Sequence, residues 1–247
     1  MAKQSGLGDN FYLHGYNVSG DLGSISVSGG PAALEVTGID KSAYQRIGGL
    51  RTGGMTWQAW FNPATDQGHD RFSSLPTTDV IASYFRGTTL GNPAACQVSK
   101  QINYDGNRGD DGAFTFQVDA QCNGFGVEWG RSLTAGVRTD TEATNGTGID
   151  TTASASFGAQ AYLQAFAMTG TDVTVKIQDS ADNVTFADVA GLAFTQLTAG
   201  NTAERIATGN TATIRRYIRA VTVTTGGFSS LAFAVVIVKN EIAGQVF

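Results

Sequence analysis

The chain has 247 residues and a net charge of −5, with only 15% charged residues, 32 glycines and two cysteines. Soluble proteins average about 25% charged residues and about 7% glycine, so this chain is poor in charge and rich in glycine. This composition excludes a disordered tail, a disulfide-stapled scaffold and a coiled coil. The length admits one large β domain or two domains of ordinary size.

The negative charge lies in the first part of the chain. Residues 1–150 hold 10 basic and 15 acidic side chains, whereas residues 151–247 hold six of each. Because phosphate contacts need Lys and Arg, the chain is a poor candidate for gripping nucleic acid. An acidic surface is instead compatible with nucleic acid that passes by without binding.

No segment indicates export or membrane insertion. The first ten residues are polar, and the longest apolar run, residues 231–238, is far shorter than a membrane span. We therefore expect the chain to stay in the cytosol, where Cys96 and Cys122 remain reduced thiols. In a hairpin that turns near Arg108, the numbers of two residues that face each other across the strands add up to 216–218. Cys96 and Cys122 fit this sum, which would make them close neighbours.

Alternating apolar and polar residues, divided by Gly, Asn and Asp clusters, predict an all-β protein. In residues 55–61, Trp57, Ala59 and Phe61 share one face of a strand, and Thr56, Gln58 and Trp60 share the other. Short helices are expected only at 40–47 and 70–75, where an Asp could cap the first turn. The predicted strands lie near 11–18, 22–28, 32–38, 53–61, 79–86, 94–104, 112–121, 125–133, 157–168, 172–179, 184–189, 193–197, 203–208, 214–225 and 230–239.

The polar stretch 138–152 has no periodicity and is interpreted as a linker or long loop. It divides the chain into a first domain, residues 1–137, and a second domain, residues 153–247. The second is a normal size for a compact β-sandwich.

No residue pattern indicates catalysis or metal binding, so we predict no enzyme, no cofactor and no metal site. His14 and His69 have no partner at metal-ligand or triad spacing, and neither thiol has a basic neighbour. The loop 105–112, which contains Arg108-Gly109-Asp110, lacks the calcium-loop spacing and suits a hairpin turn. The glycine pairs at 48–49 and 53–54 lack the phosphate-loop pattern.

Three stretches of the first part resemble the major tail tube proteins of long, non-contractile tailed phages. They are residues 34–61 (LEVTGIDKSAYQRIGGLRTGGMTWQAWF), residues 79–91 (DVIASYFRGTTLG), and residues 114–120 followed by Trp129. The second part, through residues 173–189 and 216–223, resembles the jelly-roll or immunoglobulin-like β-sandwiches that decorate phage tail and capsid proteins. The resemblance implies a tail-tube-like β-sandwich or barrel followed by a smaller decoration sandwich.

The resemblance also implies a function in assembly. Such subunits form hexameric rings that stack into a tube with an acidic or neutral bore. Other tail proteins lie at both ends, and genomic DNA passes through without specific binding. The protein would then be assembled in the host cytoplasm and reside in the virion tail, with no membrane partner.

Two arms, residues 1–12 and 38–54, are expected to become ordered against the adjacent ring. The candidate contact residues between subunits are Phe11, Tyr44, Arg46 and Leu50, since Tyr and Arg are enriched at contact hot spots; packing within one subunit is the alternative. Two other functions stay open: a virion-attached protein that binds carbohydrate on the host surface through residues 153–247, and a capsid decoration protein.

Overall fold

The structure is a computed structural model that describes residues 5–75 and 78–244. The described residues form seventeen strands, one α-helix and one 3-10 helix, which confirms the all-β class. The helices are α1 (Gly68–Phe72) and η1 (Ser19–Asp21). The strands are β1 (Asn10–Leu13), β2 (Tyr16–Asn17), β3 (Leu22–Glu35), β4 (Arg46–Trp60), β5 (Val80–Phe85), β6 (Pro93–Gln101), β7 (Asp105–Arg108), β8 (Phe114–Cys122), β9 (Glu128–Ser132), β10 (Arg138–Asp140), β11 (Ile149–Asp150), β12 (Ala159–Gly170), β13 (Thr174–Ser180), β14 (Ala187–Ala193), β15 (Thr202–Ala207), β16 (Tyr217–Val223) and β17 (Phe228–Lys239).

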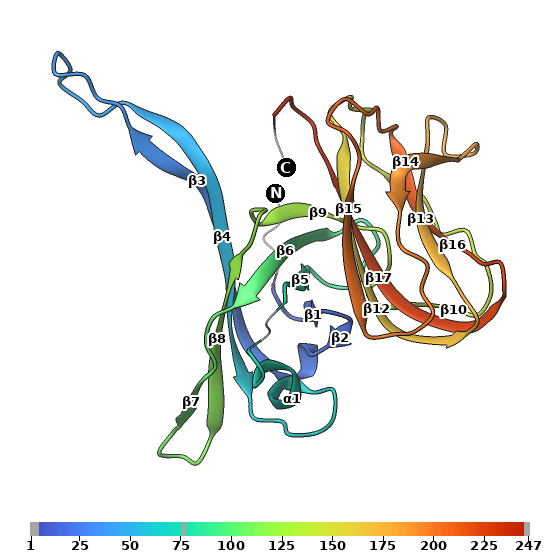
Figure 1. Ribbon diagram of the computed structural model, residues 1–247, viewed down its shortest axis with the longest axis horizontal. Helices are drawn as coiled ribbons and strands as arrows, with labels where there is room; N and C mark the ends of the chain where they lie inside the picture. The colour runs from blue at the N-terminus through green and yellow to red at the C-terminus, as the bar shows by residue number, and fades with distance from the viewer. Residues whose placement is uncertain (1–4, 76–77, 245–247) are drawn as a thin grey trace.

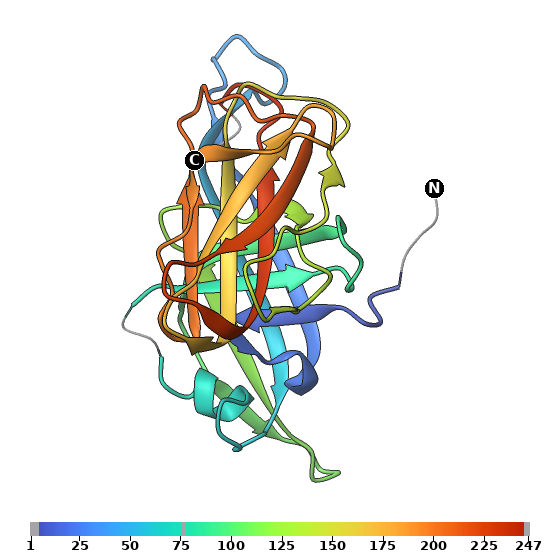
Figure 2. The same ribbon diagram turned by 90° about the vertical axis from the view of Figure 1, so that its right-hand side faces the viewer.

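These strands pair antiparallel in two sheets. A thirteen-stranded, branched sheet runs β15-β12-β17-β9-β6-β5-β1-β2, and a branch through β8 adds β4, β3 and β7. The other sheet has the order β11-β16-β13-β14. Figure 1 shows the β3–β4–β8–β7 branch on one side of the molecule and the four-stranded sheet on the other. Figure 2 looks onto the second half of the chain, with the long β3–β4 hairpin behind it.

Three apolar cores separate the layers. The first joins the β3–β4–β8 branch to β1, β5 and β6, and the last joins β12 and β17 to the four-stranded sheet. The middle core joins the two halves of the chain, with Tyr12, Phe85 and Cys96 on one side and Tyr162 and Val236 on the other. Successive residues of β12 and β17 therefore face two different cores, which explains the continuous apolar run at 231–238.

Most predicted strands are present, with shifted ends. The alternation at 55–60 is confirmed, because Met55, Trp57 and Ala59 are buried while Gln58 and Trp60 are exposed. The helix expected at 40–47 is wrong: these residues form the turn of the β3–β4 hairpin and the start of β4. The helix expected at 70–75 occurs two residues earlier, as α1. No strand spans 193–197, where Leu197 makes only a single bridge to Val173.

The stretch 138–152 contains β10, paired with β17, and β11, paired with β16. The linker is therefore partly built into both sheets. The division of the chain into domains at 1–137 and 153–247 stays a prediction.

Candidate self-assembly surfaces

The β3–β4–β8–β7 branch, here called the outer sheet, is the part of the fold that its own chain leaves most open. Its strands lie in register, so that Ser24, Gln58, Gln117 and Asp105 stand in one row across all four. One face packs on the first core through side chains such as Ile25, Trp57 and Val118. None of the residues that the structure describes forms a layer over the opposite face.

That opposite face, here called the polar face, is uncharged apart from two carboxylates. The residues that make up this face, given below, include no Lys or Arg, and Lys100 on the adjoining β6 is ion-paired with Asp79. The carboxylate of Asp119 accepts a hydrogen bond of 2.6 Å from the Thr56 hydroxyl and another from the Asn103 amide. The polar face consists of Ser24, Ser26, Ser28, Thr56, Gln58, Trp60, Asp105, Asn107, Thr115, Gln117, Asp119 and Gln121.

The outer sheet has two open edges. Among the described residues, β3 pairs only with β4, and β7 pairs only with β8. The β3 edge is 14 residues long. Residues 22–34 contain no charged side chain. Register shifts at Leu22/Ser24 and Pro31/Ala33 interrupt the edge near its two ends, and residues 24–30 between them pair regularly with β4. Proteins normally blunt exposed edges with Lys, short strands or bulges, because an unguarded edge pairs with another chain.

The part of the β3–β4 hairpin that includes its turn extends away from the body of the molecule. Strand β4 pairs with β8 only from Gly54 onward, so residues 31–51, here called the outer hairpin, form a two-stranded ribbon. Glycine is required where the ribbon leaves, because a Cβ on Gly53 would lie 2.9 Å from Val127 Cγ2. An isolated two-stranded hairpin is only marginally stable in water. The outer hairpin nevertheless exposes six large apolar side chains: Leu34, Val36, Ile39, Tyr44, Ile47 and Leu50.

The structure places three of the four predicted contact residues on this outer hairpin. Tyr44 is 69% and Leu50 88% exposed, and the Arg46 guanidinium lies 5.1 Å from the centre of the Tyr44 ring. None of the three packs into a core of its own subunit. Their contact with a neighbouring copy stays a prediction, which the proposal below develops.

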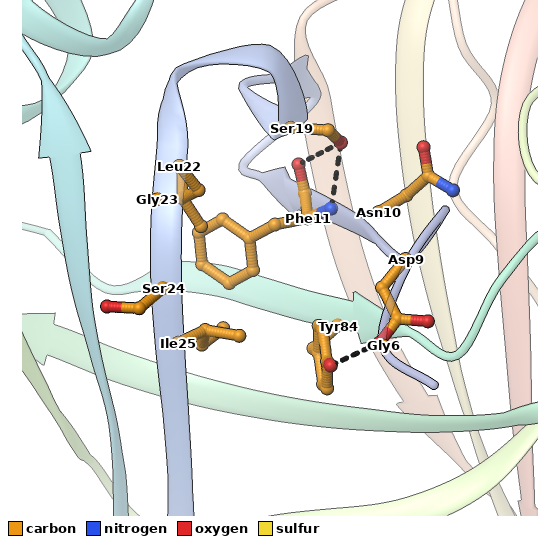
Figure 3. A pocket seen from close by; sticks show the side chains of 10 residues that line it. All are labelled: Gly6, Asp9, Asn10, Phe11, Ser19, Leu22, Gly23, Ser24, Ile25 and Tyr84. Atoms are coloured by element: carbon orange, nitrogen blue, oxygen red, sulfur yellow. Dashed lines mark hydrogen bonds between the residues drawn. The ribbon is translucent and has the colours of Figure 1, made fainter. Parts of the chain in front are cut away.

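Phe11 lies elsewhere. It is 2% exposed in β1, where its ring packs 4.9 Å from that of Trp57. Figure 3 shows it at the wall of a pocket of about 320 Å³ that also touches Leu22–Ile25 of β3. The Phe11 ring belongs to the first core of its own subunit, and its contact with a neighbouring copy stays a prediction. Residues 1–4 of the predicted N-terminal arm lie outside the described residues.

Neither histidine lies in a metal or catalytic cluster. Among residues 5–75 and 78–244, no three His, Cys, Asp or Glu side chains gather as a metal site requires. His14 lies in the β1–β2 turn, and burial lowers its pKa. His69 Nδ1 lies 2.9 Å from the Tyr104 hydroxyl. The loop 105–112 belongs to the β7–β8 hairpin: residues 105–108 are strand β7, and the expected hairpin turn follows them. No helix in the described part of the chain has the length and apolarity to cross a membrane.

Both cysteines are free thiols, but their predicted pairing is wrong. Strand β8 lies against β6 with paired positions that sum to 221, which places Cys122 opposite Ser99, whereas Cys96 lies opposite Glu128 of β9. Burial raises the pKa of Cys96 to about 12 and that of Cys122 to about 11. Neither thiol is therefore activated as a nucleophile.

The row of Ser24, Gln58, Gln117 and Asp105 was not predicted from the sequence. A partial signal exists in residues 22–34, where serines alternate with Ile25 and Val27 and no charge protects the strand. The alternation predicts a strand with one polar and one apolar face, but it does not predict which strands pair with it.

No family model and no curated protein matches the chain. Among solved structures, it is similar to a chain of the virion of a native gene transfer agent particle, with 12% identity and a TM-score of 0.42, over 51% of this chain and 98% of that one. It is also similar to the SPP1 Dit protein, described as a hub of the adsorption apparatus in phages that infect Gram-positive bacteria. That match has 12% identity and a TM-score of 0.32, over 93% of this chain and 98% of that one. The chain thus has a distant structural similarity to tail and baseplate hub proteins.

Proposed function

We propose that this protein is a structural subunit of a phage-type tail, whose copies close into stacked rings that form the tail tube. The observation that carries the proposal is the outer sheet. It combines two unpaired edges with an uncovered polar face whose twelve residues include no Lys or Arg.

Ring closure follows from the two edges. Strand β3 of one copy would pair with β7 of the next, and the same contact repeated around an axis closes a ring. Each contact satisfies backbone groups that the isolated subunit leaves to water. It also covers the stretch of the 14-residue β3 edge that lies opposite the four residues of β7, and so shortens an edge that otherwise favours aggregation.

The polar face would line the bore of the ring. Each copy contributes the carboxylates of Asp105 and Asp119, together with neutral Ser, Thr, Asn and Gln side chains. A wall of this kind offers phosphates neither ion pairs nor counterion release, so DNA slides past without being held. This arrangement agrees with the acidic excess of residues 1–150 and with the resemblance to tail tube proteins.

A disulfide cross-link tests the proposed edges in the full chain. Ser24 and Asn107 lie on β3 and β7, three strand spacings apart within one copy, or at least about 14 Å. That separation is too long for a disulfide, so a Ser24→Cys/Asn107→Cys variant can cross-link only between copies. A second double variant, Ser26→Cys/Asn107→Cys, tests β3–β7 pairing shifted by two residues. We expect oxidised protein to give a ladder of bands that ends at a closed ring.

The single variants serve as controls, because each should give no ladder. A dimer band from Ser24→Cys alone would show β3 pairing with β3, which contradicts a ring. Rings seen by negative-stain microscopy in either double variant, without any ladder, would show that other edges close the ring. Wild-type protein that stays monomeric when concentrated and seeded with tail tips would refute the proposed function itself.

A further inference from the structure

A cluster of aromatic rings lies at the end of the outer sheet opposite the outer hairpin. It consists of Phe61, His69, Tyr104, Phe114 and Phe116, and it is here called the aromatic end. The Tyr104 and Phe116 rings stack at 4.0 Å, and Phe61 lies 4.8 Å from His69 and 5.4 Å from Phe114. Phe61 and Phe114 stay 41% and 40% exposed.

The aromatic end is an uncovered continuation of the first core. The cross-strand pairs Trp57–Val118 and Ala59–Phe116 are buried, and the next pair along the same face is Phe61–Phe114. Helix α1 covers one side of this row through His69. The described chain supplies no further layer, so the last pair of the core row meets solvent.

The outer hairpin and the aromatic end lie at the two ends of one strand. Strand β4 begins at Arg46 in the outer hairpin and ends at Trp60, next to Phe61. Its 15 residues span roughly 46 Å at about 3.3 Å per step. Figure 1 shows the free end of the β3–β4 hairpin at the top and β7 with α1 at the bottom. Two apolar surfaces at opposite ends of one subunit suit a contact that repeats head to tail.

The two surfaces also carry opposite charge. Residues 31–51 hold three basic and two acidic side chains, and Arg46 is exposed. The loop 105–112, which borders the aromatic end, holds Asp105, Asp110 and Asp111 against the single Arg108. The opposite signs favour contact between the two ends of different copies over contact between two like ends.

We propose that the aromatic end is the acceptor for the outer hairpin of a second copy in the adjacent ring. This inference rests on the proposed function and names the surface that receives the outer hairpin. Leu50 and Tyr44 of one copy pack against Phe61 and Phe114 of the other. Arg46 then faces the acidic loop 105–112.

Two variants separate the donor from the acceptor. Leu50→Asp places a carboxylate on the outer hairpin, and Phe114→Asp places one on the aromatic end. Each alone should still form rings but require at least about a tenfold higher protein concentration to stack. Mixed together, they should form ring pairs, because one variant retains a working acceptor and the other a working hairpin. Sedimentation and negative-stain microscopy would measure both results.

Val184→Asp is the matched control for Leu50→Asp, since it puts the same charge on an apolar residue of the second half that is about as exposed as Leu50, and it should not affect stacking. If Phe114→Asp melts early, the exposed pair Asp110→Lys/Asp111→Lys replaces it, with the same weakened stacking expected. Acceptor variants that stack like wild type would overturn this inference and leave ring formation intact. Absence of rings in the wild type would instead refute the proposed function.

Discussion

A buried ion pair holds the two halves of this protein together, and its removal gives a prediction of calculable size. The Arg205 guanidinium on β15 donates hydrogen bonds of 3.1 Å to each carboxylate oxygen of Glu128 on β9. Their side chains are only 8% and 2% exposed. The Tyr162 hydroxyl donates to the same carboxylate, and burial, followed by the charge of Glu128, raises the Tyr162 pKa.

Arg205→Met would leave the Glu128 carboxylate buried without a cation. Removing one partner of a buried pair costs about 3–5 kcal/mol of unfolding free energy. In a chain of this length each kcal/mol lowers the melting temperature by about 2–4 °C, so we expect a fall of roughly 6–20 °C. Adding Glu128→Gln should recover part of the loss, because the amide oxygen still accepts from Tyr162 without a charge.

Arg216→Met is the matched control. Arg216 contacts Asp150 through two hydrogen bonds of 2.7 and 2.6 Å, the same fork geometry as the buried pair. The side chains are 43% and 45% exposed, however, so water screens the pair and we expect a much smaller fall in melting temperature than for Arg205→Met. Urea unfolding at pH 7, followed by Trp fluorescence, measures both variants. Equal losses for Arg205→Met and Arg216→Met would refute the argument from burial.

Three further predictions concern charge and protonation. Gln117→Lys adds a cation to the polar face, so assembled tubes of this variant should bind DNA at low salt. Tubes of the control variant Gln196→Lys, whose added charge lies on the second half of the chain, should not bind DNA. Fluorescence anisotropy of labelled DNA measures both, and equal binding by the two variants would argue against a bore lined by the polar face. Asp182 accepts backbone hydrogen bonds from Thr185 and Val184 that lower its pKa to about 2, so its contribution to stability is complete above pH 4 and is lost as the pH falls toward 2. The urea midpoint of wild type should therefore drop over that range, and drop less in Asp182→Asn. Cys96, with its raised pKa, should resist Ellman's reagent at pH 8 until urea unfolds the chain, and fast labelling of the folded protein would contradict its burial.

Local sequence pattern was enough to predict much of this protein. Alternation at residues 55–60 identified a two-faced strand, and the long apolar run at 231–238 belongs to a strand that is buried on both sides. Both patterns follow from the period-two geometry of a strand, which each residue shows with its immediate neighbours. The scarcity of charge and the acidic excess of the first part were likewise visible from composition alone.

The helix expected at 40–47 failed for a physical reason. An Asp before a short run that includes Tyr44 satisfies the local rule for a helix start. In the folded chain, however, strands β3 and β4 pair as far as Glu35 and Arg46, and the residues between them must turn back. A pairing along many residues outweighs the weak propensity of a single helical turn.

Tertiary structure alone decided which residues share a surface. Ser24, Gln58, Gln117 and Asp105 are far apart in the chain, and Glu128 and Arg205 are 77 residues apart. The register of each strand is set by which of its side chains must be buried in a core. A shift of the pairing by one residue would move every side chain of that strand to the other face of the sheet. Local alternation is the same in every register, so the polar face, the aromatic end and the buried ion pair emerge only once the layers are packed.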